Sequence, residues 1–80
     1  MKIKSIKIIG RNSLKYYNLK QNLESAIKEL DLRVEISEIE DENYFIDHKL
    51  IDIPALLVND RVLSKGVIPT KSHLELLLSL

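Results

Sequence analysis

Residues 6–30 read IKIIGRNSLKYYNLKQNLESAIKEL, and this stretch decides the fold of the 80-residue chain. Its β-branched beginning predicts a buried strand that ends at Gly10, and the loop over 10–13 then leads into a long helix. In that helix the apolar residues recur at intervals of three and four, which places them on one face. They are Tyr16, Leu19, Leu23, Ala26, Ile27 and Leu30. Such a loop receives the free N–H groups and the positive dipole end of the helix, and it is a common place for chemistry.

Four strands are predicted. The first covers residues 3–9, but Ile3 and Ile6 are out of phase, so its start is expected to fray or to bulge. Strict alternation predicts the second over residues 32–36. An apolar run predicts a third, buried on both faces, over residues 55–58. The pair Asn59-Asp60 tolerates positive φ, so residues 61–64 should return as the second arm of a hairpin.

Three helices are predicted. The first runs from residue 13 to residue 30, and a short second helix is expected over about residues 42–50, with acidic residues in its first turn. The third runs over residues 70–80 with Thr70 as its cap, although Ser72 with Glu75 offers a competing capping box. On this helix Leu74, Leu77 and Leu78 make the core face, whereas Leu76 and Leu80 lie off it. We expect fraying at Leu80 and self-association at Leu76, that is, a homodimer through the C-terminal helix.

The order strand, helix, strand, helix, strand, strand, helix predicts one α/β domain over residues 1–80. Two strand–helix–strand steps imply parallel crossovers, and the hairpin adds an antiparallel strand. We therefore expect a mixed four-stranded sheet with helices on both faces.

Composition excludes several classes of function. The chain has no cysteine, which removes disulfides, thiolate chemistry and cysteine-based metal sites. His48 and His73 lie in different predicted helices without the spacing of a zinc motif, so no metal and no cofactor are predicted. No apolar run approaches the roughly 20 residues of a membrane span, and the first residues lack the pattern of a secretory signal. A cytoplasmic protein without a membrane partner is the expectation.

The net charge of zero hides a segregation along the chain. Residues 1–23 contain six basic residues and no acidic one, whereas residues 29–47 contain eight acidic residues and Arg33. One interpretation is a pair of faces that attract each other inside the fold. The other is an anion-attracting patch around Arg11 and Lys15, reinforced by the helix dipole. A nucleic-acid partner is not predicted, because the overall charge lacks a basic excess.

Several short motifs, taken together in their order and spacing, indicate a family resemblance. They are Ile8-Ile9-Gly10, residues 26–30, Ile53-Pro54-Ala55-Leu56, Val58-Asn59-Asp60 and Pro69-Thr70-Lys71. In these motifs the chain resembles the small thioredoxin-like or glutaredoxin-like proteins known as redox-active disulfide proteins, over nearly its whole length. The resemblance implies a thioredoxin-like fold. It also places the family's Cys-x-x-Cys on Ser13-Leu14-Lys15-Tyr16, so both cysteines are replaced.

The resemblance implies that the Ile53–Pro54 bond is cis and lies against the loop before the first helix. In the family, the backbone of the residue before this proline pairs with an extended substrate segment, which Ile53 can still do without a cysteine. A purely architectural turn at Pro54 is the alternative. The first hypothesis is therefore a redox-inactive module that binds a peptide, a protein or a small anion in the groove between residues 11–17, at the start of the first helix, and Ile53-Pro54. Its candidate residues are Arg11, Asn12, Ser13, Tyr16, Tyr17, Ile53 and Pro54.

A second resemblance gives the competing hypothesis. Glutathione transferases share this domain and use a serine or tyrosine hydroxyl near the same helix end to stabilise a thiolate, which suggests an enzyme that orients a thiol through Ser13 or Tyr16. The helical second domain of those enzymes is absent from these 80 residues. The simplest interpretations are that Ser13 or Asn12 caps the helix and that Tyr16 packs in the core. A third possibility is a site that has decayed, with an interaction role elsewhere.

Overall fold

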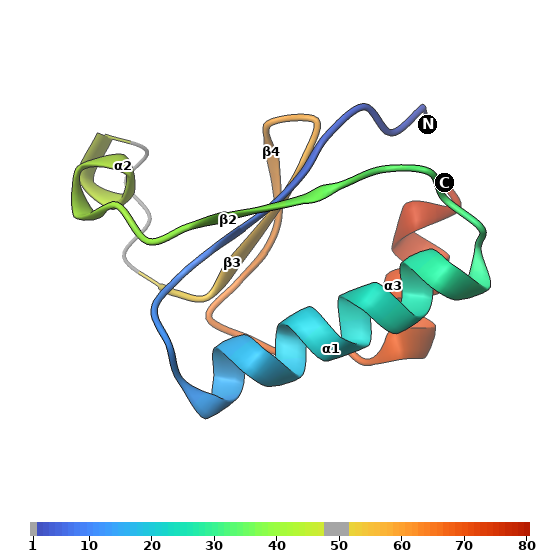
Figure 1. Ribbon diagram of the computed structural model, residues 1–80, viewed down its shortest axis with the longest axis horizontal. Helices are drawn as coiled ribbons and strands as arrows, with labels where there is room; N and C mark the ends of the chain where they lie inside the picture. The colour runs from blue at the N-terminus through green and yellow to red at the C-terminus, as the bar shows by residue number, and fades with distance from the viewer. Residues whose placement is uncertain (1, 48–51) are drawn as a thin grey trace.

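The computed structural model describes residues 2–47 and 52–80, and its elements follow the predicted order (Figure 1). Their bounds are β1 (Ile6–Ile9), α1 (Leu14–Glu29), β2 (Ile36–Ile39), α2 (Glu42–Asp47), β3 (Ala55–Val58), β4 (Arg61–Lys65) and α3 (Lys71–Leu78). The predicted end of the second helix, together with His48, lies outside the described residues.

The strands form a four-stranded sheet in the order β2-β1-β3-β4. Strand β1 is parallel to β2 and antiparallel to β3, which is antiparallel to β4, so the sheet is mixed as predicted. The first expected crossover, from β1 through α1 to β2, is confirmed, because these two strands are parallel. The expectation of a second parallel crossover was wrong, because β3 runs opposite to β1. The register explains the reversal: Ile39 at the end of β2 and Ala55 at the start of β3 both lie beside Ile9. The segment between them therefore joins two points at the same end of the sheet, and β3 must run back.

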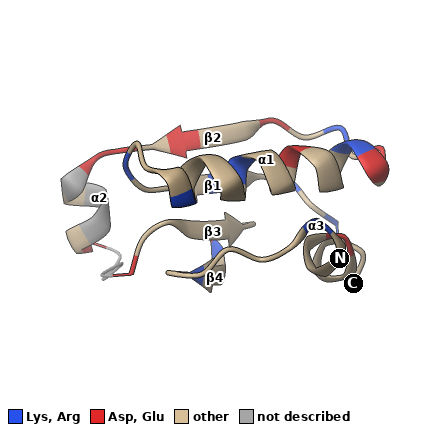
Figure 2. Ribbon diagram, turned by 90° about the horizontal axis from the view of Figure 1, so that it is seen from below, with Lys and Arg blue, Asp and Glu red and all other residues tan. Residues whose placement is uncertain are grey.

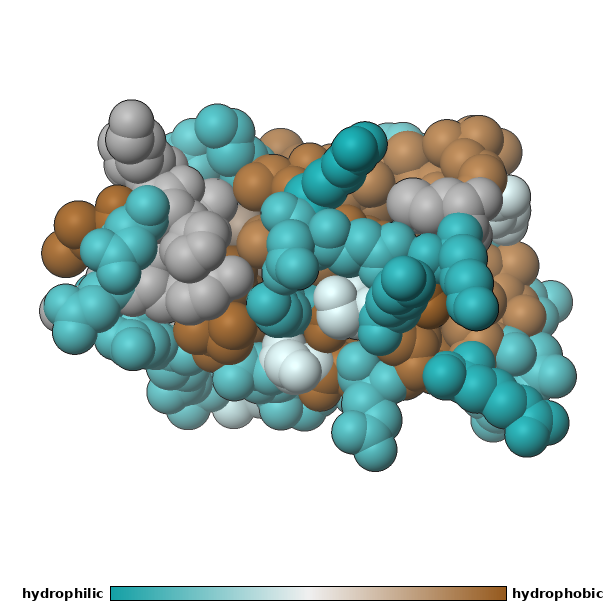
Figure 3. All heavy atoms as spheres, turned by 90° about the horizontal axis from the view of Figure 1, so that it is seen from above, coloured by the Kyte–Doolittle hydropathy of each residue, from teal (hydrophilic) through white to brown (hydrophobic). Residues whose placement is uncertain are grey.

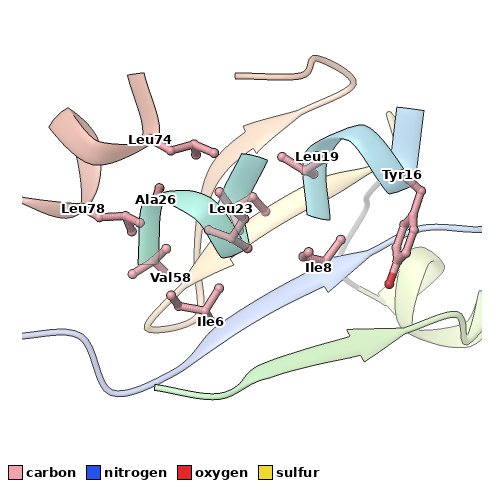
Figure 4. Close-up of a cluster of buried hydrophobic side chains, with 10 residues drawn as sticks. Ile6, Ile8, Tyr16, Leu19, Leu23, Ala26, Val58, Leu74 and Leu78 are labelled. Carbon is pink, nitrogen blue, oxygen red and sulfur yellow. The ribbon is translucent and has the colours of Figure 1, made fainter. Parts of the chain in front are cut away.

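One face of the sheet carries the main core. Helices α1 and α3 pack against each other over this face, while α2 lies away from them, beyond the end of β2 (Figure 1). The buried side chains from the strands and helices meet between these layers (Figure 4). They are Ile6, Ile8, Leu56 and Val58 from the sheet and Tyr16, Leu19, Leu23, Ala26, Leu74 and Leu78 from the helices. This aliphatic burial supplies most of the stabilisation available to so short a chain.

The opposite face holds a smaller buried cluster of Ile9, Ala55 and Leu57, against which Ile39 and Ile53 pack. Much of the middle of this face is covered by polar side chains (Figure 3). Strand β3 is consequently buried along its whole length, as its continuous apolar run predicts. This central position makes β3 the element on which the candidate site is anchored.

Two strands begin later than the alternation predicts. Strand β1 begins at Ile6 rather than at residue 3, and β2 covers Ile36–Ile39 rather than residues 32–36. Hydrogen bonds to one side chain, that of Asn59, explain both differences. The Asn59 side chain accepts hydrogen bonds from the backbone N–H groups of Lys4 and Ser5, at 2.6 and 3.1 Å. The residues before β1 therefore run beside the β3–β4 turn, and residues 32–35 have no strand to pair with.

The turns and helix ends follow the local sequence. Asn59 and Asp60 both have positive φ, 52° and 66°, which is the geometry of a tight hairpin turn. Asp31 also has positive φ, and the Leu32 N–H donates to the Ile27 carbonyl at 3.0 Å. Together with the bond from the Asp31 N–H to the Lys28 carbonyl, this is a Schellman ending of α1.

Helix α3 begins as Thr70 predicts. The Thr70 hydroxyl accepts a hydrogen bond from the His73 N–H at 3.1 Å, so the competing cap at Ser72 was wrong. The helix ends at Leu78, with Ser79 as its C-cap, and Leu80 lies beyond it. Leu76 is 64% exposed, and self-association through it stays a prediction.

Candidate functional site

The candidate site begins with the cap of α1. Ser13 has extended backbone angles, and its hydroxyl accepts a hydrogen bond from the Tyr16 N–H at 3.1 Å. The Tyr17 N–H also donates to the Ser13 carbonyl at 3.1 Å, so the first turn is closed from residue 13. Of the two predicted caps, Ser13 rather than Asn12 holds this position. The loop after β1 is thereby fixed where it meets the helix.

Gly10 joins this loop to the proline loop before β3. A Cβ atom at Gly10 would lie 3.1 Å from the Tyr16 ring and 3.2 Å from the Pro54 Cβ. Tyr16 and Pro54 therefore approach the same point from two parts of the chain that are far apart in sequence. Only a residue without a side chain fits there without displacing a neighbour. The structure thus brings the start of α1 and the Pro54 loop together, as the resemblance implies.

The Pro54 loop is held by Gly66, the first residue after β4. The Ile53–Pro54 peptide bond is cis, and Pro54 is buried. The Pro54 carbonyl accepts a hydrogen bond from the Gly66 N–H at 3.0 Å. Gly66 has a φ of 72°, and a Cβ there would lie 3.0 Å from the Asp52 Cβ, so glycine is needed both for the backbone angle and for space.

The Tyr16 side chain is buried, and its hydroxyl is hydrogen-bonded. Its side chain is 3% exposed and points from α1 toward β2 (Figure 4). Its hydroxyl donates a hydrogen bond to the Glu38 Oε1 at 2.6 Å. Burial and then this carboxylate raise the pKa of Tyr16, so the phenol stays protonated over the physiological range. The structure therefore leaves Tyr16 no free hydroxyl for the thiol of a transferase substrate.

Glu38 is the partner that sequence reasoning missed. The Tyr16 hydroxyl and then Lys20 lower the pKa of this carboxyl, and the Lys20 Nζ lies 3.2 Å from the Glu38 Oε1. Lys20 belongs to the basic part of the sequence and Glu38 to the acidic part. This pair supports the interpretation in which the two charged faces attract each other inside the fold. The acidic character of residues 35–41 was visible in the sequence, but the pairing of Glu38 with Tyr16 depends on the register of β2.

The rim of the site is polar and exposed. Tyr17 is 54% exposed, its ring meets that of Tyr16 edge-on at a centroid distance of 6.0 Å, and its hydroxyl donates to the Asn12 Oδ1 at 3.2 Å. Arg11, Asn12 and Ser13 are also exposed. Ile53 is half-buried on the other side of the loop. Five of the seven candidate residues are thus exposed or half-buried, whereas Tyr16 and Pro54 are buried.

The hollows on the described surface include one of about 280 Å3 beside Tyr17 and two that lie away from the candidate residues. One, of about 490 Å3, is between α1 and β2, and its apolar floor is made by Ile27, Val34 and Ile36. The other, of about 390 Å3, is between β4 and α3, where the buried Ser64 hydroxyl has no hydrogen-bond partner in the described part of the chain. Neither hollow is bordered by Ser13 or Pro54.

Other classes of site find no support in residues 2–47 and 52–80. Histidine and acidic side chains form no group of three that is able to hold a metal ion. Over the same residues, no helix combines the length and the apolar character that crossing a membrane requires.

Comparison with known proteins identifies the family. No curated protein and no solved structure matches the chain. The family model described as a thioredoxin domain matches residues 4–79, which include all of the strands and helices given above. Thiol–disulfide exchange requires a thiolate, and these 80 residues contain no cysteine. The chain therefore belongs to the thioredoxin-domain family, as a member without cysteine.

Proposed function

We propose that this chain is a redox-inactive binding module that holds an extended peptide segment of a partner between the start of α1 and the Pro54 loop. The observation that carries the proposal is the close approach of both Tyr16 and Pro54 to Gly10, in a chain with no cysteine. In this proposal the packing of the start of α1 beside the Pro54 loop serves binding, although no cysteine is present. A peptide is recognised there through backbone groups, which need no thiol.

The surroundings support an extended ligand. Within the described residues, no hydrogen bond engages the Ile53 backbone, so its N–H and carbonyl are available to a peptide. Tyr17 offers an exposed aromatic face on the other side. Arg11 and Lys15, with the N-terminus of α1, give this end of the site a positive potential that suits a carboxylate or an acidic side chain of the ligand.

The transferase hypothesis is not favoured. Of its two candidate hydroxyls, that of Tyr16 is buried against Glu38, and that of Ser13 already accepts the capping hydrogen bond. A thiolate needs a hydroxyl that can donate a hydrogen bond to it. Ser13 accepts the capping hydrogen bond but can still donate through its O–H, so it is the one candidate that the transferase hypothesis retains.

A titration monitored by NMR tests the proposal. We expect both glutathione, an extended tripeptide, and S-methylglutathione to shift the backbone amides of Ser13, Tyr17 and Ile53 to the same extent, because backbone contacts do not need the sulfur. Inorganic phosphate should leave Ile53 unchanged. A response that requires the free thiol would favour the transferase instead, and an equal response to phosphate would reduce the site to an anion site at the helix end.

A pair of variants localises the binding. Tyr17→Ala should weaken binding of S-methylglutathione about fivefold, the loss expected when a single aromatic contact is removed. Leu76→Ala is the matched control, because Leu76 is similarly exposed but lies on α3. Equal affinities for the two variants would contradict the proposed position of the ligand.

A further inference from the structure

The outer edge of β2 is open. Strand β2 is the last strand on its side of the sheet, so only one of its edges is paired. The Gly10 N–H donates to the Ile39 carbonyl at 3.0 Å, which shows that the backbone groups of Ile39 point toward β1. Since successive residues of a strand alternate in this direction, the N–H and carbonyl groups of Ile36 and Glu38 point away from the sheet. They form the beginning of a ladder that another strand can complete.

The hollow between α1 and β2 lies beside this open edge. Ile36 and Glu38 pair in register with Ile6 and Ile8, so their side chains lie on the same face of the sheet as α1. The hollow has a volume of about 490 Å3, and its lining combines apolar with charged side chains. The apolar ones are Ile27, Val34 and Ile36, and the charged ones are Lys20, Glu24, Lys28, Glu35 and Glu38. A strand added to β2 would therefore place every second side chain over this hollow, where an apolar side chain fits.

The charge of the edge selects the partner. Residues 34–41 contain four carboxylates, of Glu35, Glu38, Glu40 and Asp41, and no cation. Figure 2 shows acidic residues on β2 and on the segments at both of its ends. The α1 side of the hollow carries one further carboxylate, of Glu24, and two amines, of Lys20 and Lys28, so the negative charge is concentrated on the β2 side. Lys20 bridges Glu24 and Glu38 at 4.0 and 3.2 Å, which leaves Glu35 outside the ion pairs of the described residues.

A second copy of the chain does not suit this edge. Pairing of two β2 strands would bring two sets of these four carboxylates together, and like charges on neighbouring strands are destabilising. We propose that the β2 edge binds an extended basic segment of another protein, which adds a strand, inserts an apolar side chain between α1 and β2, and pairs lysine or arginine side chains with the carboxylates of residues 35–41. This surface is separate from the Pro54 loop and does not depend on the function proposed there.

Three synthetic octapeptides test this surface with the full 80-residue chain. The first alternates lysine and valine, the second alternates glutamate and valine, and the third is the lysine peptide with every second backbone nitrogen methylated. We expect the first to shift the amides of Ile36 and Glu38 saturably and to slow their hydrogen exchange, with smaller changes at Ser37 and Ile39. The glutamate peptide should not bind. The methylated peptide should bind at least about tenfold more weakly, because it lacks the N–H groups of one edge.

Variants of the chain test the charge contribution. The double variant Glu35→Gln/Glu40→Gln should weaken binding of the lysine peptide about fivefold, and the loss should shrink at high salt. Glu29→Gln/Glu75→Gln makes the same change of net charge but removes carboxylates near Lys71 instead, so its affinity should equal that of the unmodified chain.

Three results would overturn the inference. The first is binding of the methylated peptide as tight as that of its parent, which would show that charge alone attracts it. The second is a set of shifts at Ser13 and Ile53 in place of Ile36 and Glu38, which would assign the peptide to the other site. The third is the absence of saturable shifts, which would show that the carboxylates protect the edge rather than recruit a strand.

Discussion

Tyr16 stands where the resemblance places the second cysteine of the family, and its environment is that of a core residue with a polar tip. The ring packs beneath the loop, and the hydroxyl reaches the Glu38 carboxylate at 2.6 Å. Gly10 beneath it has no room for a side chain. These two residues therefore shape the buried part of the site, whereas Asn12, Ser13 and Tyr17 around them are exposed.

Removal of the Tyr16 hydroxyl should destabilise the chain. We expect Tyr16→Phe to lower the free energy of unfolding by about 1–2 kcal/mol, because a hydrogen bond to a charged group is lost. Urea denaturation measures the effect. Tyr17→Phe is the matched control, because the Tyr17 hydroxyl bonds to Asn12 at 3.2 Å on the exposed surface, and its loss should cost less than about 0.5 kcal/mol. Similar losses in the two variants would argue against a special role for the contact with Glu38.

A methyl group at Gly10 should disturb both sides of the site. Gly10→Ala introduces a Cβ 3.1 Å from the Tyr16 ring and 3.3 Å from the Pro54 Cα, and the second of these is backbone that cannot easily move. We expect a destabilisation of about 1–3 kcal/mol, with shifts of the Tyr16 and Ile53 amides. Ser25→Ala on the exposed side of α1 provides a baseline. Unchanged stability of Gly10→Ala would mean that the two loops are not packed as closely as the geometry indicates.

At the scale of elements, the helix ends follow local chemistry and the strands follow their partners. Ser13 and Thr70 each accept a hydrogen bond from an N–H three residues later, which is what a cap does in any fold. Strand β2, in contrast, begins only where β1 offers it a partner. The alternation of burial at Leu32, Val34 and Ile36 is retained, but it extends four residues before the strand itself.

The two candidate caps of α3 give a direct comparison. Thr70→Ala should lower the free energy of unfolding by about 1 kcal/mol, because the His73 N–H loses its acceptor. Ser72→Ala should be nearly neutral, because Ser72 is exposed within the helix rather than before it. Thermal unfolding of both variants checks the order. A larger loss for Ser72→Ala would restore the capping box that the structure rejects.

At the scale of the whole molecule, the pair of Tyr16 and Glu38 makes stability depend on pH at both ends of the scale. The pKa of Glu38 lies below its ordinary value of 4.5 in the folded chain, because of Tyr16 and then Lys20. Its contribution is complete above that value and is lost as the pH falls through the lowered pKa. The pKa of Tyr16 is raised above 10.0 by burial and then by Glu38, so its contribution is complete below pH 10 and is lost as the pH rises further.

We therefore expect the urea midpoint to fall below about pH 4 and again above about pH 10. Tyr16→Phe should flatten both limbs, because it removes the raised phenol and returns the Glu38 carboxyl toward its ordinary pKa. Tyr17→Phe should keep both. A Tyr16→Phe variant that retained the full alkaline fall would place the titration on another group.

The sequence by itself determined the order of the elements, the buried β3 and the hairpin turn, and it narrowed the N-terminal caps of α1 and α3 to two candidates each, because each of these features depends on residues a few positions apart. The loss of disulfide chemistry also follows from the letters alone. Only the tertiary structure decided the direction of β3, the start of β2, the partner of the Tyr16 hydroxyl and the open edge beside α1. These features depend on which distant strands pair and in what register, and register is set when Asn59, Gly10 and Gly66 bring separate segments into contact. These contacts between distant segments cannot be predicted from the local spacing of apolar residues.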